Sequence, residues 1–475
     1  MSQIMNIFKK YPRTFWVANS IELIERAAWY GFFMLFANYL TESSDLGGLE
    51  FSQSQKGIIM GVGTGILYFL PVITGAIADR YGYKKVLILA FSIYTSAFLL
   101  FPFFHSFTGV FIMYLYLALG AALFKPVISA TIAKTTNDKT ASIGFGIFYM
   151  MVNIGAFIGP LITLLFRENT FYISGGIIAL NFILLLFYKE PDRGVQTKSL
   201  GESIKQIFKN IIVVFLDFKF MLFLLIIAGF WTMYNQLFYS LPVFINQWVD
   251  SHQMFLFFQE HFPFIAHQYA EGGQMDAEFI TNIDAMYIII FQVMISSIVM
   301  KLKPLSTIIT GFIIATIGMA LTVYTNNVLF ILVAIFVFSI GEMSASPKIT
   351  EYIGRIAPID KKALFMGFAY VPMFLGNIFA GIVSGPVYQR SSDKYELAIN
   401  YARENQLHMD ASLTKNQSFE SYAQQLNINP MEFTNVLWNQ YHPADFWYVI
   451  FAIGMASAFS LFLYDRFVVG EKALK

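Results

Sequence analysis

The chain has 475 residues, of which 57% are hydrophobic and only 13% charged, and its mean hydropathy is +0.59. A soluble domain carries roughly 25% charged residues, so this composition excludes that class and indicates a polytopic membrane protein. The net charge of +1 gives no basis for nucleic-acid binding, and a sequence without cysteine excludes disulfides and thiol catalysis.

The first residues, MSQIMNIFKKYPRTFWV, place basic side chains before a long apolar run. This run is longer than the apolar part of a signal peptide and shows no small-residue cleavage site, so we expect a retained first span. A bilayer span needs about 20 mostly apolar residues, and the sequence predicts twelve of them. The predicted spans are 15–40, 55–78, 84–104, 107–134, 140–166, 171–189, 218–247, 281–301, 305–324, 327–356, 363–388 and 446–468.

The first span contains three charged residues, in the stretch ELIERAAWYGFF (22–33). Glu22, Glu25 and Arg26 are spaced i, i+3 and i+4, so they share one helical face, and Tyr30 continues this face by one turn. Each charge costs about 2.5–3.5 kcal/mol at the bilayer centre, so the face should line a protein interior or a water-filled cavity. A desolvated carboxylate beside a like charge binds protons readily, as a proton-coupled carrier requires. The alternative is a structural Glu–Arg pair that only neutralises itself.

Basic residues of the loops fall mainly on one side of the spans, and they include Lys9, Lys10, Arg13 and the linker KEPDRGVQTKSLGESIKQIFKN. By the positive-inside rule, that side is the cytoplasm. We therefore expect both termini in the cytoplasm and the protein in the plasma (inner) membrane.

The linker at 190–217 divides the chain into residues 1–189 and 218–475, each with six predicted spans. Transporters built from two similar halves around a midplane site have this arrangement. Two polar insertions, 248–280 and 389–445, fall on the outer side, and the second contains partly helical sequence. Lids or partner sites are possible roles, although solvated insertions without a transport role are the commoner case.

Two further charges lie inside predicted spans. Lys125 sits in the middle of span four, in LGAALFKPVIS, and Glu342 lies in span ten, in VFSIGEMSASPKITEY. A buried cation and a buried anion suit a zwitterion, with Glu342 facing an ammonium and Lys125 facing a carboxylate. The alternative is that these two residues pair with each other, because buried ions must be paired.

Several motifs together resemble known transporters. GAIADRYGYKK (75–85) resembles the cytoplasmic loop motif of the major facilitator superfamily, here with Gly75, Asp79, Arg80 and Gly82. E-x-x-E-R in span one, Lys-Pro in span four, FYMMVNIGAFIGP, FWTMYNQ and GEMSASP resemble, in order, the proton-dependent oligopeptide transporter family. The resemblance covers nearly the whole membrane region and implies an all-α fold of two six-helix bundles.

The resemblance also implies residue roles. Glu22, Glu25 and Arg26 would couple protons and sense a carboxylate. Lys125 would pair with Glu22 or Glu25 until a peptide carboxylate arrives, and Glu342 would bind the peptide amino terminus. The residues implied for the substrate site are Arg26, Tyr30, Tyr68, Lys125, Tyr149, Asn153, Trp231, Asn235, Glu342 and Ser346.

The sequence departs from this family pattern at the outer end of the cavity. Phe33 and Asn235 stand where the family has an arginine and a carboxylate that form an outer-gate ion pair. Because both charged residues of the pair are absent, neither is left buried without a partner. We therefore interpret the site as altered and not as inactive. The family's usual route for proton coupling therefore lacks one protonatable group here, and Asp284 in span eight is a candidate replacement.

The sequence thus predicts a symporter that imports di- and tripeptides with protons by alternating access. One alternative is a facilitator of another small amphiphile or anion, and another is a non-transporting receptor or scaffold. An enzyme is not favoured, because no nucleophile–base arrangement or metal cluster is evident. We expect small peptides, protons and the lipid bilayer as partners, no cofactor, no metal, no nucleic acid, and a monomer.

Overall fold

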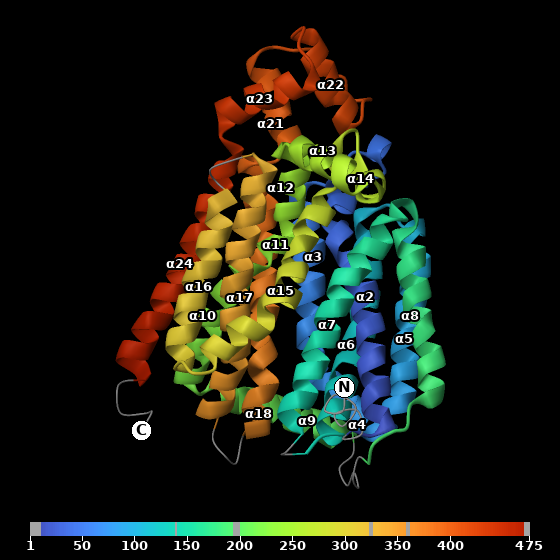
Figure 1. Cartoon of the computed structure of the whole chain (residues 1–475), viewed down its shortest axis with the longest axis vertical. Coiled ribbons are helices and arrows are strands. Elements are labelled where there is room, and N and C mark those ends of the chain that lie inside the picture. The colour runs from blue at the N-terminus through green and yellow to red at the C-terminus, as the bar shows by residue number, and fades with distance from the viewer. Residues whose placement is uncertain (1–10, 138–139, 193–199, 323–325, 358–361, 470–475) are drawn as a thin grey trace. The chain divides into compact units, whose positions relative to one another are not determined.

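The fold is given by a computed structural model that describes residues 11–137, 140–192, 200–322, 326–357 and 362–469. The described part is almost entirely helical (Figure 1). The helices of the first half are α2 (Arg13–Thr41), α3 (Gln53–Phe69), α4 (Pro71–Tyr81), α5 (Tyr83–Leu100), α6 (Phe107–Lys134), α7 (Ala141–Leu164), α8 (Thr170–Phe187) and α9 (Leu200–Phe215). The main helices of the second half are α10 (Phe218–Tyr234), α11 (Gln236–Tyr239), α12 (Leu241–Trp248), α15 (Ala277–Val299), α16 (Pro304–Leu321), α17 (Val328–Ile356), α18 (Lys362–Gly367), α19 (Val371–Ile382), α20 (Tyr388–Ser391) and α24 (Phe446–Leu463).

Every predicted span contains helix, and the all-α membrane fold is confirmed. Within the described residues, 10 helical segments are long and apolar enough to cross a bilayer, and α3 with α4 forms one more span that is bent by 43°. The helix α2 has 29 residues but is not among these, because its charged and polar residues lower its hydropathy. Span seven is interrupted, since α10 ends at Tyr234 and α11 starts at Gln236.

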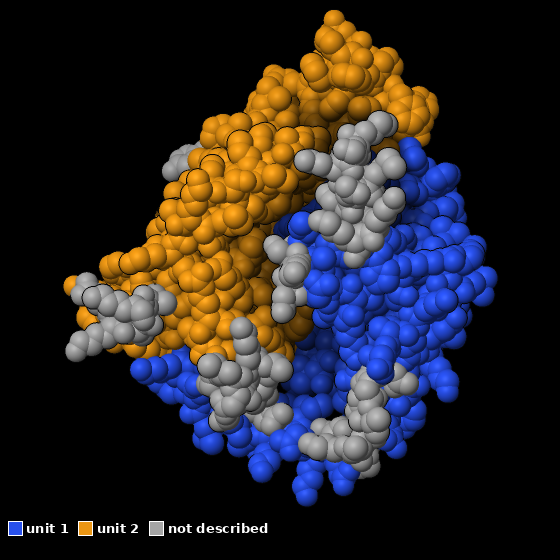
Figure 2. All heavy atoms as spheres, turned by 60° about the horizontal axis from the view of Figure 1, so that its bottom comes forward, with its two compact units in different colours: residues 1–32, 66–221 blue, residues 33–65, 222–475 orange. Residues whose placement is uncertain are grey.

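The chain forms two compact units, coloured in Figure 2. Unit 1 comprises residues 1–32 and 66–221, and unit 2 comprises residues 33–65 and 222–475. The outer parts of α2 and α3 therefore pack with the second half of the chain, although they belong to the first half in sequence. The division into halves 1–189 and 218–475 stays a prediction.

In unit 1, glycines let α7 approach α2 closely. A Cβ atom on Gly159 would overlap the carbonyl oxygen of Ala27, and one on Gly155 would lie 2.8 Å from the Cβ of Arg26. Small residues four apart allow two membrane helices to approach within backbone contact. The glycines of FYMMVNIGAFIGP thus fix the charged part of α2 against α7.

In unit 2, α17 packs against α15 and α16, and the first half of α3 packs against α19. A side chain on Gly57 of α3 would overlap the carbonyl oxygen of Gly381 of α19, and one on Gly381 would overlap that of Gly57. The two backbones therefore touch with no side chain between them.

Both outer insertions are folded. The first contains α13 (His252–His261), α14 (Pro263–Gln268) and the antiparallel hairpin β1 (Ala270–Glu271) and β2 (Gln274–Met275). The second contains α21 (Lys394–Glu404), α22 (Lys415–Gln425) and α23 (Pro430–Tyr441), which we call the cap (Figure 1). Capping boxes start α22 and α23, and Phe419, Phe433 and Leu437 form the buried core of the cap. The predicted helical sequence in this insertion is confirmed.

Candidate functional site

The charged residues of α2 form one buried cluster in unit 1. Arg26 binds Glu25 through two contacts, from Nε to Oε2 at 2.5 Å and from Nη2 to Oε1 at 2.6 Å. The hydroxyl of Tyr94 on α5 donates to the same Oε1 at 2.7 Å. Glu25 is fully buried, so its carboxylate is held from two directions by charge-assisted hydrogen bonds.

Glu22 is held far less tightly than Glu25. Its Oε1 lies 3.5 Å from Arg26 Nε, and this is a longer contact than either bond to Glu25. The side chain is nevertheless buried, and the charge of Lys125 also acts on it. Of the two carboxylates, Glu22 is the one that can change its protonation state without disrupting the bidentate pair.

Lys125 and Tyr30 flank this cluster, and each takes part in a cation–π contact. The ammonium of Lys125 lies 4.8 Å from the centroid of the Tyr68 ring, and the guanidinium of Arg26 lies 5.8 Å from that of Tyr30. Among the described residues of unit 1, Lys125 forms no ion pair, so the implied pairing with Glu22 or Glu25 is not present in this structure. A cation–π contact of this kind contributes about 0.5–2 kcal/mol and leaves the ammonium able to bind a carboxylate.

Tyr149 and Asn153 lie one turn apart on α7. The amide of Asn153 donates to the carbonyl oxygen of Tyr149 at 2.8 Å, and the Tyr149 side chain is exposed on the protein surface of unit 1. Their predicted contact with substrate stays a prediction.

In unit 2, Glu342 of α17 is buried with one carboxylate oxygen unpartnered. Its Oε1 accepts a hydrogen bond from the hydroxyl of Tyr234 at 2.9 Å, whereas Oε2 has no partner among the described residues. The Ser346 hydroxyl, one turn further along α17, also lacks a partner in the described part of the chain. Trp231 packs edge-on against Tyr234 with ring centroids 4.8 Å apart, so α10 supplies an aromatic wall near Glu342.

The two positions that depart from the family pattern, Phe33 and Asn235, are both buried in unit 2. Phe33 is buried against Phe238 and Tyr239, with ring centroids 5.6 and 6.1 Å apart. Asn235 is also buried at the break of span seven, where its Nδ2 has no partner among the described residues. Phe33 thus lies in aromatic packing at this end of α2, and the loss of a gate ion pair at these two positions stays a prediction.

Between α4 and α5, the chain makes the sharp turn that the loop motif predicts. Gly82 has φ +107°, a conformation that side chains rarely adopt, and Tyr83 donates from its hydroxyl to Asp79 at 2.9 Å. Glu190 caps α5 by accepting the backbone N–H of Tyr83 at 2.8 Å. A Cβ atom on Gly75 would lie 3.7 Å from the Cβ of Pro126 of α6, while Arg80 is exposed.

Comparison with known proteins identifies this architecture. The sequence profile of the Major Facilitator Superfamily matches residues 21–381, which is well over half of the chain. The chain belongs to the Major Facilitator Superfamily. Membership makes it a multi-pass membrane transporter rather than an enzyme.

Relatives of this superfamily member are distant. It is 23% identical over 343 residues to the uncharacterized MFS-type transporter YqjV of Bacillus subtilis, covering 70% of this chain and 77% of that protein. It is also 23% identical over 462 residues to the peptide transporter YePEPT of Yersinia enterocolitica, covering 77% of this chain and 86% of that protein. Among solved structures, it resembles a POT family transporter in complex with 5-aminolevulinic acid, with a TM-score of 0.69, 17% identity and coverage of 98% and 97% of the two chains.

The structure of this facilitator superfamily member also contains a buried polar network that sequence analysis missed. Lys56 of α3 is fully buried, and its ammonium donates to the carbonyl oxygen of Tyr239 at 2.8 Å and to Gln53 Oε1 at 2.7 Å. The Gln53 and Gln247 amides in turn donate to Asp393, at 3.2 and 2.8 Å. The only sign of this network in the sequence is a lysine near the start of a predicted span. Lysines at such positions usually extend their ammonium group to the membrane surface, so they do not indicate a buried site.

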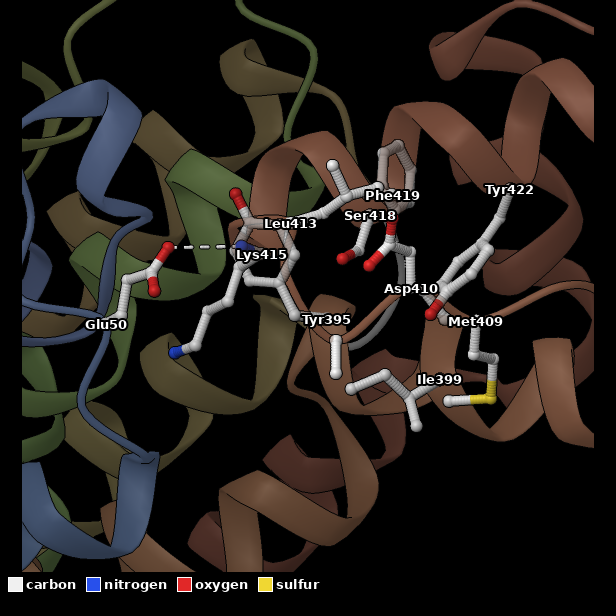
Figure 3. Close-up of a pocket in the computed structure, with 12 residues that line it drawn as sticks. Glu50, Tyr395, Ile399, Met409, Asp410, Leu413, Lys415, Ser418, Phe419 and Tyr422 are labelled. Atoms are coloured by element: carbon white, nitrogen blue, oxygen red, sulfur yellow. Dashed lines mark hydrogen bonds between the residues drawn. The ribbon is translucent and has the colours of Figure 1, made fainter.

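A second set of contacts ties the cap to the loop between α2 and α3. The ammonium of Lys415 donates to the carbonyl oxygens of Thr41 and Phe51, both at 3.0 Å, and its backbone N–H donates to Glu50 at 3.1 Å (Figure 3). Thr414 and Asn416 donate to Asp45, at 2.8 and 3.2 Å. We call these contacts the clasp. A cavity of about 260 Å³ lies beside it, lined mainly by Tyr395, Ile399, Met409, Leu413 and Phe419.

Proposed function

We propose that this transporter imports di- and tripeptides together with protons. The observation that carries the proposal is a pair of opposite charges that lack ionic partners within their own units. In unit 1, Lys125 lies over a tyrosine ring, and in unit 2, Glu342 keeps one free carboxylate oxygen. A peptide presents one carboxylate and one ammonium, so it satisfies both groups, each of which is costly to leave unpaired.

The relatives support this assignment. YePEPT is named a peptide transporter, and the similar POT family structure holds 5-aminolevulinic acid, a molecule with one amino and one carboxylate group. The motifs from E-x-x-E-R to GEMSASP, which occur in the same order as in that family, also support the assignment. We therefore place the chain in the proton-dependent oligopeptide transporter family of the superfamily.

The proposed mechanism is alternating access by movement of the two halves around a central site. Protonation of Glu22 weakens its interaction with Arg26, and the peptide carboxylate then binds to Lys125 or Arg26. Inward release of peptide and proton restores the cluster. We propose a monomer in the plasma membrane, with both termini in the cytoplasm as the basic loops indicate.

Uptake of labelled di- and tripeptides into proteoliposomes tests this function. We expect accumulation when an inward proton gradient is imposed and only equilibration without it. Failure of every tested peptide to accumulate, with protein shown to be folded, would refute peptide import.

A facilitator of another amphiphile or an anion is the rival function. An N-acetylated dipeptide separates the two, because it keeps the carboxylate but loses the ammonium that Glu342 would bind. Binding of the acetylated and free dipeptides with equal affinity would favour the rival. A receptor or scaffold is tested by deleting residues 389–445, since a carrier should retain measurable uptake without the cap.

A further inference from the structure

Unit 2 contains a second buried carboxylate next to Glu342. Asp284 of α15 is 6% exposed, and its Oδ1 accepts a hydrogen bond from the hydroxyl of Ser339 on α17 at 2.6 Å. Ser339 precedes Glu342 by three residues, so the two lie on one helical face about one turn apart. Asp284 therefore lies beside Glu342, and its charge acts directly on that residue.

No basic side chain balances this pair within the described part of unit 2. The nearest cation along α17 is Lys348, which is bound to Glu351 at 2.8 Å. From α10, only the neutral hydroxyl of Tyr234 reaches the pair, and α12 and α16, which pack on α15 and α17, contain no titratable residue. The other titratable groups described on neighbouring elements lie elsewhere: Glu278 and Tyr287 of α15, Tyr352 and Arg355 of α17, and His252, Glu260 and His261 of the exposed α13.

Two adjoining carboxylates without a counter-ion cannot both remain ionised in a buried site, and such pairs hold one proton between them. The pair then carries one negative charge. Glu342 Oε2, which is buried and has no partner in the described part of unit 2, is the oxygen available to accept a hydrogen bond from a ligand.

We propose that Asp284 and Glu342 act as one protonatable unit that retains a proton and offers a single negative charge to the ammonium of the substrate. This inference rests on the proposed peptide transport and adds a second proton-binding site to it, in the other half of the chain from Glu22. An ammonium binds the charged pair without any proton transfer. A second proton, taken up from water, neutralises the pair, and the ammonium leaves as a cation.

The variant Asp284→Asn tests the pair. Asparagine imitates the neutral acid and can still accept the hydrogen bond from Ser339, so the fold and peptide binding should persist. In the wild-type protein, alkaline pH should remove the proton that the pair shares, whereas Asp284→Asn holds no shared proton and should release one proton fewer per protein on alkaline titration. Glu342→Gln should weaken binding of the free dipeptide much more than binding of its N-acetylated form.

Glu278→Gln is the matched control. Glu278 lies on the same helix, is buried, and accepts a hydrogen bond from Asn38 at 2.8 Å, so an amide there should leave the alkaline proton release unchanged. Asp284→Glu should restore the wild-type proton release. An unchanged proton release in Asp284→Asn, or an equal loss in Glu278→Gln, would overturn the proposal.

A measurement without substrate separates this inference from the proposed function. The infrared C=O stretch of a protonated carboxyl group should be present in the wild-type protein at neutral pH and should be reduced in Asp284→Asn. Persistence of the full band would refute the shared proton, whatever the protein transports. Loss of the band in a protein that carries no peptide would uphold the pair and refute only peptide import.

Discussion

The ammonium of Lys56 donates to the carbonyl oxygen of Tyr239 at 2.8 Å, in a site where the lysine is fully buried. This bond joins α3, from the first half of the chain, to the broken span seven of the second half. In an alternating-access transporter, such a contact must open whenever the outer side admits substrate. Lys56 and its partners are therefore candidates for the outer gate of unit 2.

Replacement of Lys56 by methionine should destabilise the protein, because the Tyr239 carbonyl and Gln53 lose their buried donor and Asp393 loses the positive charge that acts on it. The expected loss is about 3 kcal/mol or more, seen as a lower Tm. The double variant Lys56→Met with Asp393→Asn removes both charges and should recover most of the Tm. Lys85→Met, at an exposed position, is the control and should change Tm little. A double variant no more stable than the single one would show that the two residues are not coupled.

Replacement of Gly57 by alanine should open the outer side, since the added methyl group would overlap the carbonyl oxygen of Gly381. Overpacking of this kind costs about 1–3 kcal/mol in the packed state. Because the sequence contains no cysteine, Met60→Cys introduces a single thiol at a fully buried position of α3. Its labelling from outside should be faster in the Gly57→Ala background. The control is Gly146→Ala, where open space surrounds the glycine.

Neutralisation of Glu22 and of Glu25 should have different effects. Glu22→Gln should abolish uptake driven by a proton gradient but spare counterflow exchange, because only the 3.5 Å contact to Arg26 is altered. Glu25→Gln should reduce both activities and lower Tm, since Arg26 loses its bidentate partner in a buried site. Equal behaviour of the two glutamine variants would contradict this division of roles.

Tyr94→Phe should lower the free energy of unfolding by about 1.5–3 kcal/mol, the contribution of a hydrogen bond to a charged group.

The clasp should loosen at acid pH. Burial alone would raise the pKa of Glu50, but the N–H groups of Ser44 and Lys415 and the hydroxyl of Ser43 outweigh it and hold the pKa below its usual value. For Asp45, hydrogen bonds from Ser43, Thr414 and Asn416 likewise outweigh burial and lower its pKa. A carboxylate with a lowered pKa stabilises the clasped state above its free pKa, which is about 4. This contribution is lost as the pH falls through the lowered values.

Hydrogen exchange of residues 41–51 measures this effect. After correction for the intrinsic exchange rate, the protection of these backbone amides should be constant from neutral pH down to about pH 5. It should decrease when the pH is lower than about 4. Asp45→Asn combined with Glu50→Gln should remove the pH dependence. Unchanged protection of the wild-type loop at pH 3 would contradict the role of these carboxylates.

Much of this structure could be predicted because its signals are local. Apolar runs located all twelve spans, and the i, i+3, i+4 spacing placed Glu22, Glu25 and Arg26 together. The partners of these residues could not be predicted in the same way. Tyr94 reaches Glu25 from 69 positions away, and Lys56 depends on the carbonyl group of Tyr239, which is available because α11 ends at that residue. Asp284 was noted as a lone acid, but its position beside Glu342 follows from the packing of α15 on α17.

The touching backbones of Gly57 and Gly381 limit how the outer side of unit 2 can move. A gate made of a bulky side chain opens by a rotamer change in picoseconds to nanoseconds, one residue at a time. Gly57 and Gly381 have no side chain at this contact, so a rotamer change cannot open it. Any opening here requires the backbones of α3 and α19 to move apart, which involves several residues of both helices at once.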